Sequence, residues 1–153
     1  MATVKFASAD EAQTEALGAR LAAILPRAIM LYLHGPLGAG KTTLVRGLLR
    51  GLGYAGPVTS PTFTLVEPYE LDNVRVFHFD FYRVADPAEL EFLGLRDYFD
   101  GNSVCIVEWP ERAGAVLPTP DLDVMIRLSN DRGRVLQLQS HSDIGAAALR
   151  ALE

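Results

Sequence analysis

The stretch GPLGAGKT, from Gly35 to Thr42, constrains this chain more than any other part of its sequence. It satisfies the pattern G-x-x-x-x-G-K-[ST] without deviation. The apolar run at 28–34 predicts a buried strand before it, and the residues from Lys41 to about Leu52 predict a helix after it. A strand, a glycine loop and a helix in this order are typical of a phosphate-binding loop, so we predict a P-loop protein that binds a nucleoside triphosphate.

The residue types in this loop are those that phosphate binding requires. Glycines allow backbone N–H groups to turn toward the β-phosphate, and the positive end of the new helix faces the same oxygens. Lys41 is expected to reach the β- and γ-phosphate oxygens, and the hydroxyl of Thr42 is expected to ligate Mg²⁺. The loop therefore predicts both a nucleotide and a metal ion.

The rest of the chain predicts an α/β protein. Alternation in the run 73–84 predicts a strand with Phe77, Phe79 and Phe81 on one face and with His78, Asp80 and Tyr82 on the other. Further strands, helices and an antiparallel hairpin turned at NDRG are predicted from the same kinds of pattern. We expect one P-loop ATPase domain over residues 1–153, with a mostly parallel central sheet flanked by helices and a C-terminal antiparallel hairpin at the edge. The helices are expected at 10–25, 86–95 and 143–153, another strand at 103–109, and the hairpin at 121–139.

Composition narrows the class of partner and the compartment. The formal net charge of −5 argues against a protein that grips nucleic acid by itself, because such a surface is normally basic. The single cysteine, Cys105, fits a reducing compartment and a place in the core. No apolar run approaches the length that spans a bilayer, and the first residues lack a signal-peptide core. We therefore expect a soluble, cytoplasmic protein with no membrane partner.

Two acids are candidates to complete the site. Glu108 follows four apolar residues, a pattern that places a carboxylate beside a phosphate loop at the end of a strand. Asp80 lies on the polar face of its strand. The alternatives are an ion pair of Asp80 with Arg83 or Arg75, and a capping or surface role for Glu108.

Other residues near these acids leave alternatives open. The segment SPTFT at 60–64 is either part of a loop that folds over the γ-phosphate, with Thr62 and Thr64 as its candidates, or a turn stiffened by proline. Trp109 belongs either to the core or to a shield over the phosphate site. The histidines have no further ligands at metal spacing, which excludes a zinc site.

Three classes of nucleotide enzyme compete at this point. A GTPase would need a guanine-reading N-K-x-D, which the sequence lacks. A small-molecule kinase would normally carry an arginine-bearing lid. The clustered arginines of the second half, Arg132 and Arg134, lie in a hairpin too tight for a lid. The third class is an ATPase that serves other proteins by spending ATP on a conformational change, and the small-molecule kinase is its serious rival.

Five sequence motifs, of which the glycine loop is the first, resemble the motifs of one family. In order they are GPLGAGKTTLVRGLL, SPTFTLVEPY, FHFDFYR, DPAELEFLGLRDYF and IVEWPER, and the likeness covers roughly residues 8–140. The chain is similar to the bacterial tRNA threonylcarbamoyladenosine biosynthesis ATPases, the TsaE family. The resemblance implies a small cytoplasmic P-loop ATPase that binds ATP and Mg²⁺ and is weakly active when alone. It implies action with the two sugar-kinase-fold proteins that transfer threonylcarbamoyl to adenosine 37 of tRNA, resetting that complex while the partners hold the tRNA.

The resemblance also implies roles for individual residues. Thr42 and Glu108 resemble the magnesium pair, and Asp80 resembles a second essential acid. Glu11, or its neighbours, and Arg134 resemble positions that border the base and ribose. The residues that would hold the nucleotide are Glu11, Gly38, Ala39, Gly40, Lys41, Thr42, Thr43 and Arg134, and those with catalytic roles are Lys41, Asp80 and Glu108.

Overall fold

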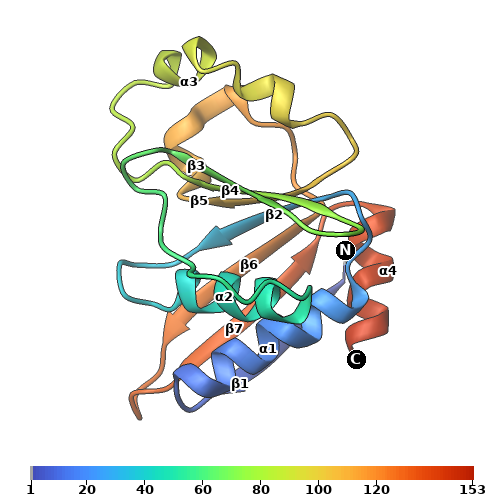
Figure 1. The fold of residues 1–153 in the computed structure, drawn as a ribbon. Helices are drawn as coiled ribbons and strands as arrows, with labels where there is room; N and C mark the ends of the chain where they lie inside the picture. Colours follow the sequence, from blue (N-terminus) through green and yellow to red (C-terminus); the bar gives the residue numbers. More distant parts are fainter. Residues whose placement is uncertain (1) are drawn as a thin grey trace.

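A computed structural model describes residues 2–153, which form a mixed α/β structure around one sheet (Figure 1). The seven strands lie in the order β1-β7-β6-β2-β5-β4-β3. They are β1 (Thr3–Ser8), β2 (Ile29–His34), β3 (Val66–Glu70), β4 (Arg75–Asp80), β5 (Val104–Glu108), β6 (Leu122–Leu128) and β7 (Arg134–Ser140). The helices are α1 (Glu11–Ile24), α2 (Lys41–Gly51), α3 (Ala88–Phe92) and α4 (Asp143–Leu152), with 3₁₀ segments at Leu95–Tyr98 and Pro110–Val116.

The four central strands, β6, β2, β5 and β4, are parallel to one another. Strand β7 turns back from β6 as an antiparallel neighbour, and β3 pairs antiparallel with β4 at the far edge. Parallel strands buried on both faces read as continuous apolar runs, which is how β2 and β5 read. The predicted α/β sheet with flanking helices and a C-terminal hairpin is therefore confirmed.

The predicted position of that hairpin at the edge of the sheet is wrong. Strand β1 pairs antiparallel with β7 along its whole length, from Thr3 opposite Gln139 to Ser8 opposite Arg134, and so forms the edge itself. The partners are far apart in sequence, and no strand was predicted for the first eight residues. Strand β6 also pairs in parallel with β2, so the hairpin continues the central sheet.

Helices cover both faces of the sheet (Figure 1). On one face α1, α2 and α4 pack into the larger apolar core, which includes Leu21, Leu48 and Leu149. On the other face α3 and the 3₁₀ segments enclose a smaller core around Phe79 and Phe81. Cys105 is buried in this second core, as predicted. Among residues 2–153 the structure contains no helix with the length and apolarity needed to cross a bilayer.

Helices α1 and α2 are in close backbone contact, and two glycines make that contact possible. A Cβ at Gly47 would lie 2.0 Å from the carbonyl oxygen of Glu15, and a Cβ at Gly18 would lie 2.4 Å from that of Leu44. No side chain fits at such distances, so these positions require glycine. This packing fixes the first turn of α2 beside the first turn of α1, where Asp10 caps the helix by accepting the N–H of Gln13 at 2.9 Å.

The helix predicted at 86–95 is shorter in the structure. Helix α3 ends at Phe92, and Gly94 adopts a left-handed conformation with φ +66° before the 3₁₀ segment begins. The carboxylate of Asp86 accepts the N–H of Ala88 at 3.0 Å, which satisfies one backbone donor at the start of the helix. The glycine therefore ends the predicted helix early, and the chain continues from Leu95 as a separate 3₁₀ segment.

Candidate functional site

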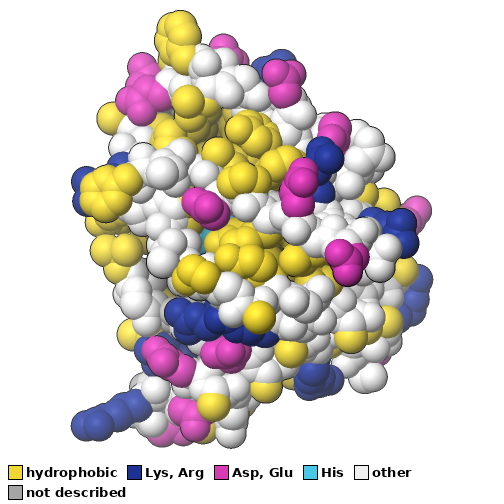
Figure 2. Space-filling view, viewed as in Figure 1, with side chains coloured by type: hydrophobic (Ala, Val, Ile, Leu, Met, Phe, Trp, Pro, Cys, Tyr) yellow, Lys and Arg dark blue, Asp and Glu magenta, His cyan; other side chains and the backbone are white. Residues whose placement is uncertain are grey.

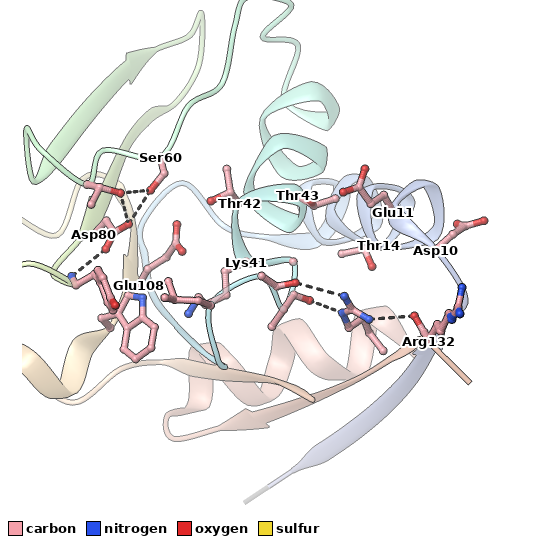
Figure 3. A pocket seen from close by; sticks show the side chains of 18 of the residues that line it. Asp10, Glu11, Thr14, Lys41, Thr42, Thr43, Ser60, Asp80, Glu108 and Arg132 are labelled. Atoms are coloured by element: carbon pink, nitrogen blue, oxygen red, sulfur yellow. Dashed lines mark hydrogen bonds between the residues drawn. The ribbon is translucent and has the colours of Figure 1, made fainter. Parts of the chain in front are cut away.

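A cavity of about 600 Å³ lies at the carboxyl ends of β2, β4 and β5 (Figure 3). Its wall combines the first turns of α1 and α2, the loop before α2, the ends of β4 and β5, and the β6–β7 turn. Ligands of open α/β sheets bind at this end of the strands. The residues expected to hold the nucleotide or the metal or to act in catalysis all lie in the wall, namely Glu11, Gly38, Ala39, Gly40, Lys41, Thr42, Thr43, Asp80, Glu108 and Arg134.

The loop that enters α2 presents unpaired backbone donors to this cavity. Gly38 and Gly40 have φ of +78° and +110°, conformations that favour glycine. Gly40 is the N-cap of α2 and supplies no side-chain cap, so the N–H groups of the first turn at 41–43 have no partner within the helix. Orphan N–H groups at the positive end of a helix form an anion site.

Lys41 supplies an ammonium group to the cavity wall. Its residue is only 5% exposed, its ammonium donates to the carbonyl oxygen of Gly35, and Nζ lies 3.9 Å from the ring centroid of Trp109. Burial lowers the pKa of Lys41, while the charges of Glu108 and Asp80 raise it. Trp109 therefore covers the lysine beside the cavity, which supports the shielding alternative for this residue.

Arg134 binds the loop itself. Its Nε donates to the carbonyl of Ala39 at 2.9 Å, one terminal nitrogen donates to Gly38 at 3.3 Å, and the other donates to two carbonyls of its own turn. The carbonyl of Ala39 and the N–H of Gly40 belong to the same peptide group, and in a trans peptide these two groups point in opposite directions. The hydrogen bond from Arg134 to the Ala39 carbonyl therefore directs the N–H of Gly40 away from the guanidinium. Arg134 thus braces the loop, and four of its five N–H donors are engaged, two by the loop and two by its own turn.

Besides Arg134, other side chains line the end of the cavity where the family resemblance predicts a base and ribose. Glu11 and Arg132 lie with Asp10 at one end of the cavity, opposite Ser60, Asp80 and Glu108 (Figure 3). Within residues 2–153 the side chain of Arg132 makes no hydrogen bond or ion pair. Of the two arginines in NDRGR, Arg132 is therefore the one free to contact a ligand.

Asp80 and Glu108 stand side by side at the ends of β4 and β5, where they are register partners. They are 4% and 3% exposed. Both oxygens of Asp80 are occupied, Oδ1 by the N–H of Tyr82 at 2.9 Å and Oδ2 by the hydroxyls of Ser60 and Thr62 at 2.6 and 3.2 Å. The ion-pair alternative for Asp80 is therefore wrong.

Glu108 has a simpler environment. Its Oε2 lies 2.6 Å from Nε2 of His78, and in the described part of the chain its Oε1 has no hydrogen-bond donor. Because Glu108 lines the cavity, this second oxygen is the one available to a ligand there. The capping or surface alternative for Glu108 is wrong, since the residue is buried and internal.

The segment 60–64 contributes hydroxyls to the site, though not the pair predicted. Thr62 lines the cavity together with Ser60, and both bind Asp80. Thr64 is exposed and lies outside the cavity wall as the structure describes it, so that prediction is wrong. The hydroxyl of Ser60 reaches Asp80 because the segment crosses the end of β4.

Sequence reasoning did not identify two residues of the site. From the sequence alone His78 raises only the question of a zinc site, whereas in the structure its imidazole holds Glu108. The alternation of the strand places His78 on the same face as Asp80, and this shared face is the sequence signal that points to a role of His78 at the site. Tyr82, also on that face, lines the cavity and lies against Trp109 with 5.1 Å between ring centroids.

The residues present fit a magnesium ion that is shared with phosphates. Across residues 2–153 no group of three or more His, Cys, Asp or Glu side chains is placed to hold a metal by itself. Magnesium in nucleotide sites takes one or two protein oxygens and completes its shell with phosphate and water. The free oxygen of Glu108 and the hydroxyl of Thr42, both in the cavity wall, are suited to that role.

Comparisons with known proteins agree on one family. The profile of the family described as "Threonylcarbamoyl adenosine biosynthesis protein TsaE" matches residues 8–136. The tRNA threonylcarbamoyladenosine biosynthesis protein TsaE of Haemophilus influenzae is 46% identical over 147 residues, covering 93% of this chain and 92% of that protein. The protein of the same name from Bacillus subtilis is 38% identical, covering 88% of this chain and 84% of its own. The crystal structure of Bacillus subtilis YdiB superposes with a TM-score of 0.86 at 30% identity, covering 99% of this chain and 94% of that one.

Proposed function

The chain belongs to the TsaE family of threonylcarbamoyl adenosine biosynthesis proteins, and we propose that it is a P-loop ATPase that binds ATP with Mg²⁺ in this cavity. The observation that carries the proposal is the meeting of three kinds of group in one cavity. They are the orphan N–H groups at 41–43, the Lys41 ammonium and an oxygen of Glu108 that receives no donor from residues 2–153. Amides and ammonium suit phosphate oxygens, and the carboxylate suits the metal.

Each residue has a distinct part in the proposed reaction. The amides of Gly38 and of residues 40–43 bind and orient the triphosphate, whereas the N–H of Ala39 donates to the carbonyl of Pro36. Lys41 offsets charge on the β- and γ-phosphates. The bound magnesium ion would supply electrostatic stabilisation of the phosphate charges, held through Thr42 and Glu108. Asp80 orients the hydroxyls of Ser60 and Thr62 at the same end of the cavity.

We propose that this ATPase serves a partner complex in the cytoplasm. The family name places the chain in tRNA modification, and the chain itself is a poor candidate to hold tRNA. Its net charge is −5, and Figure 2 shows acidic and basic side chains interspersed over the face in view. We propose that the two sugar-kinase-fold proteins of the threonylcarbamoyl transferase complex are its partners, that they bind the tRNA, and that ATP hydrolysis resets the complex between rounds.

Reconstitution of tRNA modification tests this function. Modified adenosines per transferase complex are counted with and without the chain and ATP. We expect multiple turnovers only when both are present, and we expect the partners to raise phosphate release by the chain. Phosphate release that is unaffected by the partners, with phosphate transferred to a metabolite, would instead favour the small-molecule kinase.

A further inference from the structure

His78 is a polar residue in a place where packing alone would favour an apolar one. It lies in the middle of β4, opposite Ile106 of β5, and its exposure is 0%. Its Nδ1 is buried and has no hydrogen-bond partner among the described residues. Buried polar atoms without partners cost free energy, so a residue that leaves one unpaired calls for an explanation beyond packing.

The other ring nitrogen of His78 supplies that explanation. Nε2 lies 2.6 Å from Oε2 of Glu108, a short distance even for a charge-assisted hydrogen bond. A carboxylate has only acceptors, so Nε2 carries the hydrogen of this bond. The bond crosses from β4 to β5, and residue 108 is two positions beyond the register partner of residue 78.

This contact leaves the two carboxylates of the cavity with separate partners. Asp80 is held by the N–H of Tyr82 and by the hydroxyls of Ser60 and Thr62. Glu108 is held by His78 alone, on one oxygen, while the other oxygen has no protein donor in residues 2–153. A carboxylate fixed at one oxygen presents the second in a single orientation, which is how outer partners orient metal-binding carboxylates.

We propose that His78 is a positioning residue that fixes Glu108 so that its Oε1 faces the metal ion of the bound nucleotide. The proposal rests on the proposed function of the cavity. His78 itself contacts neither nucleotide nor metal. Its loss leaves the Glu108 carboxylate free to rotate, so that Oε1 is no longer held in one orientation.

Variants of His78 test this role through metal binding. His78→Leu removes the donor, and His78→Gln places an amide N–H within reach of Glu108. The readout is the Mg²⁺ concentration at half-saturation of the protein–ADP complex, measured by calorimetry, with ADP affinity in EDTA as the reference. We expect His78→Leu to raise that midpoint by about 10- to 100-fold and to leave ADP affinity in EDTA unchanged. His78→Gln should recover most of the loss.

The double variant His78→Leu/Glu108→Ala shows whether His78 acts through Glu108. If it does, the double variant has the same Mg²⁺ midpoint as Glu108→Ala, because the carboxylate that His78 positions is already absent in Glu108→Ala. Additive effects, or an unchanged midpoint in His78→Leu, would overturn the proposal. Failure of the wild-type protein to bind ADP would instead overturn the proposed function, so the two failures are distinguishable.

A second measurement does not depend on the folding of any His78 variant. Long-range ¹H–¹⁵N spectra of the wild-type imidazole report which ring nitrogen carries the hydrogen. We expect the Nε2–H form, with an Nε2–H proton signal that is lost or shifted in Glu108→Ala. An imidazole with its hydrogen on Nδ1 only would overturn the assignment.

Discussion

Replacing Arg134 by alanine should weaken nucleotide binding, because this side chain braces the loop that carries the phosphate-binding amides. The guanidinium donates to the carbonyls of Ala39 and Gly38 and so fixes the loop that carries the Gly40 N–H. Without these bonds the loop samples other conformations. Nucleotide binding must then also supply the unfavourable free energy of ordering the loop, which lowers the affinity. The expected result is a higher dissociation constant with little change in fold.

The size of the effect follows from the geometry. Hydrogen bonds that involve a charged group contribute about 1.5 to 3 kcal/mol each. The bond from Nε to Ala39, at 2.9 Å, counts in full, whereas the bond to Gly38, at 3.3 Å and exposed, adds little. A loss of about 2 kcal/mol raises the dissociation constant about 30-fold.

Calorimetric titration with ADP and Mg²⁺ measures this change directly. Arg127→Ala is the matched control, because it removes the same charge from β6 outside the cavity wall. Arg134→Lys keeps the charge but lacks the planar guanidinium that binds two carbonyls at once. Its affinity for ADP should therefore lie between that of wild-type protein and that of Arg134→Ala. If folded Arg134→Ala binds within about twofold of wild type, the loop does not depend on this brace and the reasoning is refuted.

Three further predictions follow from packing, burial and the acids. Gly47→Ala should lower the free energy of unfolding by about 2 kcal/mol, because its Cβ would lie 2.0 Å from the carbonyl oxygen of Glu15; an unchanged melting temperature would contradict the close helix contact. Burial raises the pKa of Cys105 to about 12, so a thiol reagent at about pH 8 should modify only unfolded protein; rapid labelling of native protein would be inconsistent with this. Glu108→Ala should bind ATP but lose Mg²⁺-dependent phosphate release, whereas normal release would transfer the metal role to Asp80.

The sequence predicts the parts of this structure that depend on local pattern. The strand, the glycine loop and the helix around Lys41 are encoded in adjacent residues, and so is the hairpin from Leu122 to Ser140. Four apolar residues followed by an acid identify Glu108, because this pattern places a carboxylate beside a phosphate loop at the end of a strand. Local pattern was enough in each case because residues close in the chain decide these elements.

The parts that were missed depend on pairing between distant segments. Strand β1 is held by β7, more than 120 residues further along the chain, so its own short sequence gave little signal. The contact of His78 with Glu108 depends on the register between β4 and β5, which no single-strand pattern specifies. Arg134 was placed near the nucleotide, but only the folded loop shows that its donors bind carbonyls.

Titration of wild-type protein and of Lys41→Ala with ATP and Mg²⁺ tests the central claim most directly. Lys41 is the ammonium group in the cavity wall, beside the orphan amides of 41–43. The account predicts one nucleotide bound per wild-type chain and binding weakened by at least about tenfold in the variant. Equal affinities for the two proteins would show that the nucleotide, if it binds at all, does not occupy this cavity.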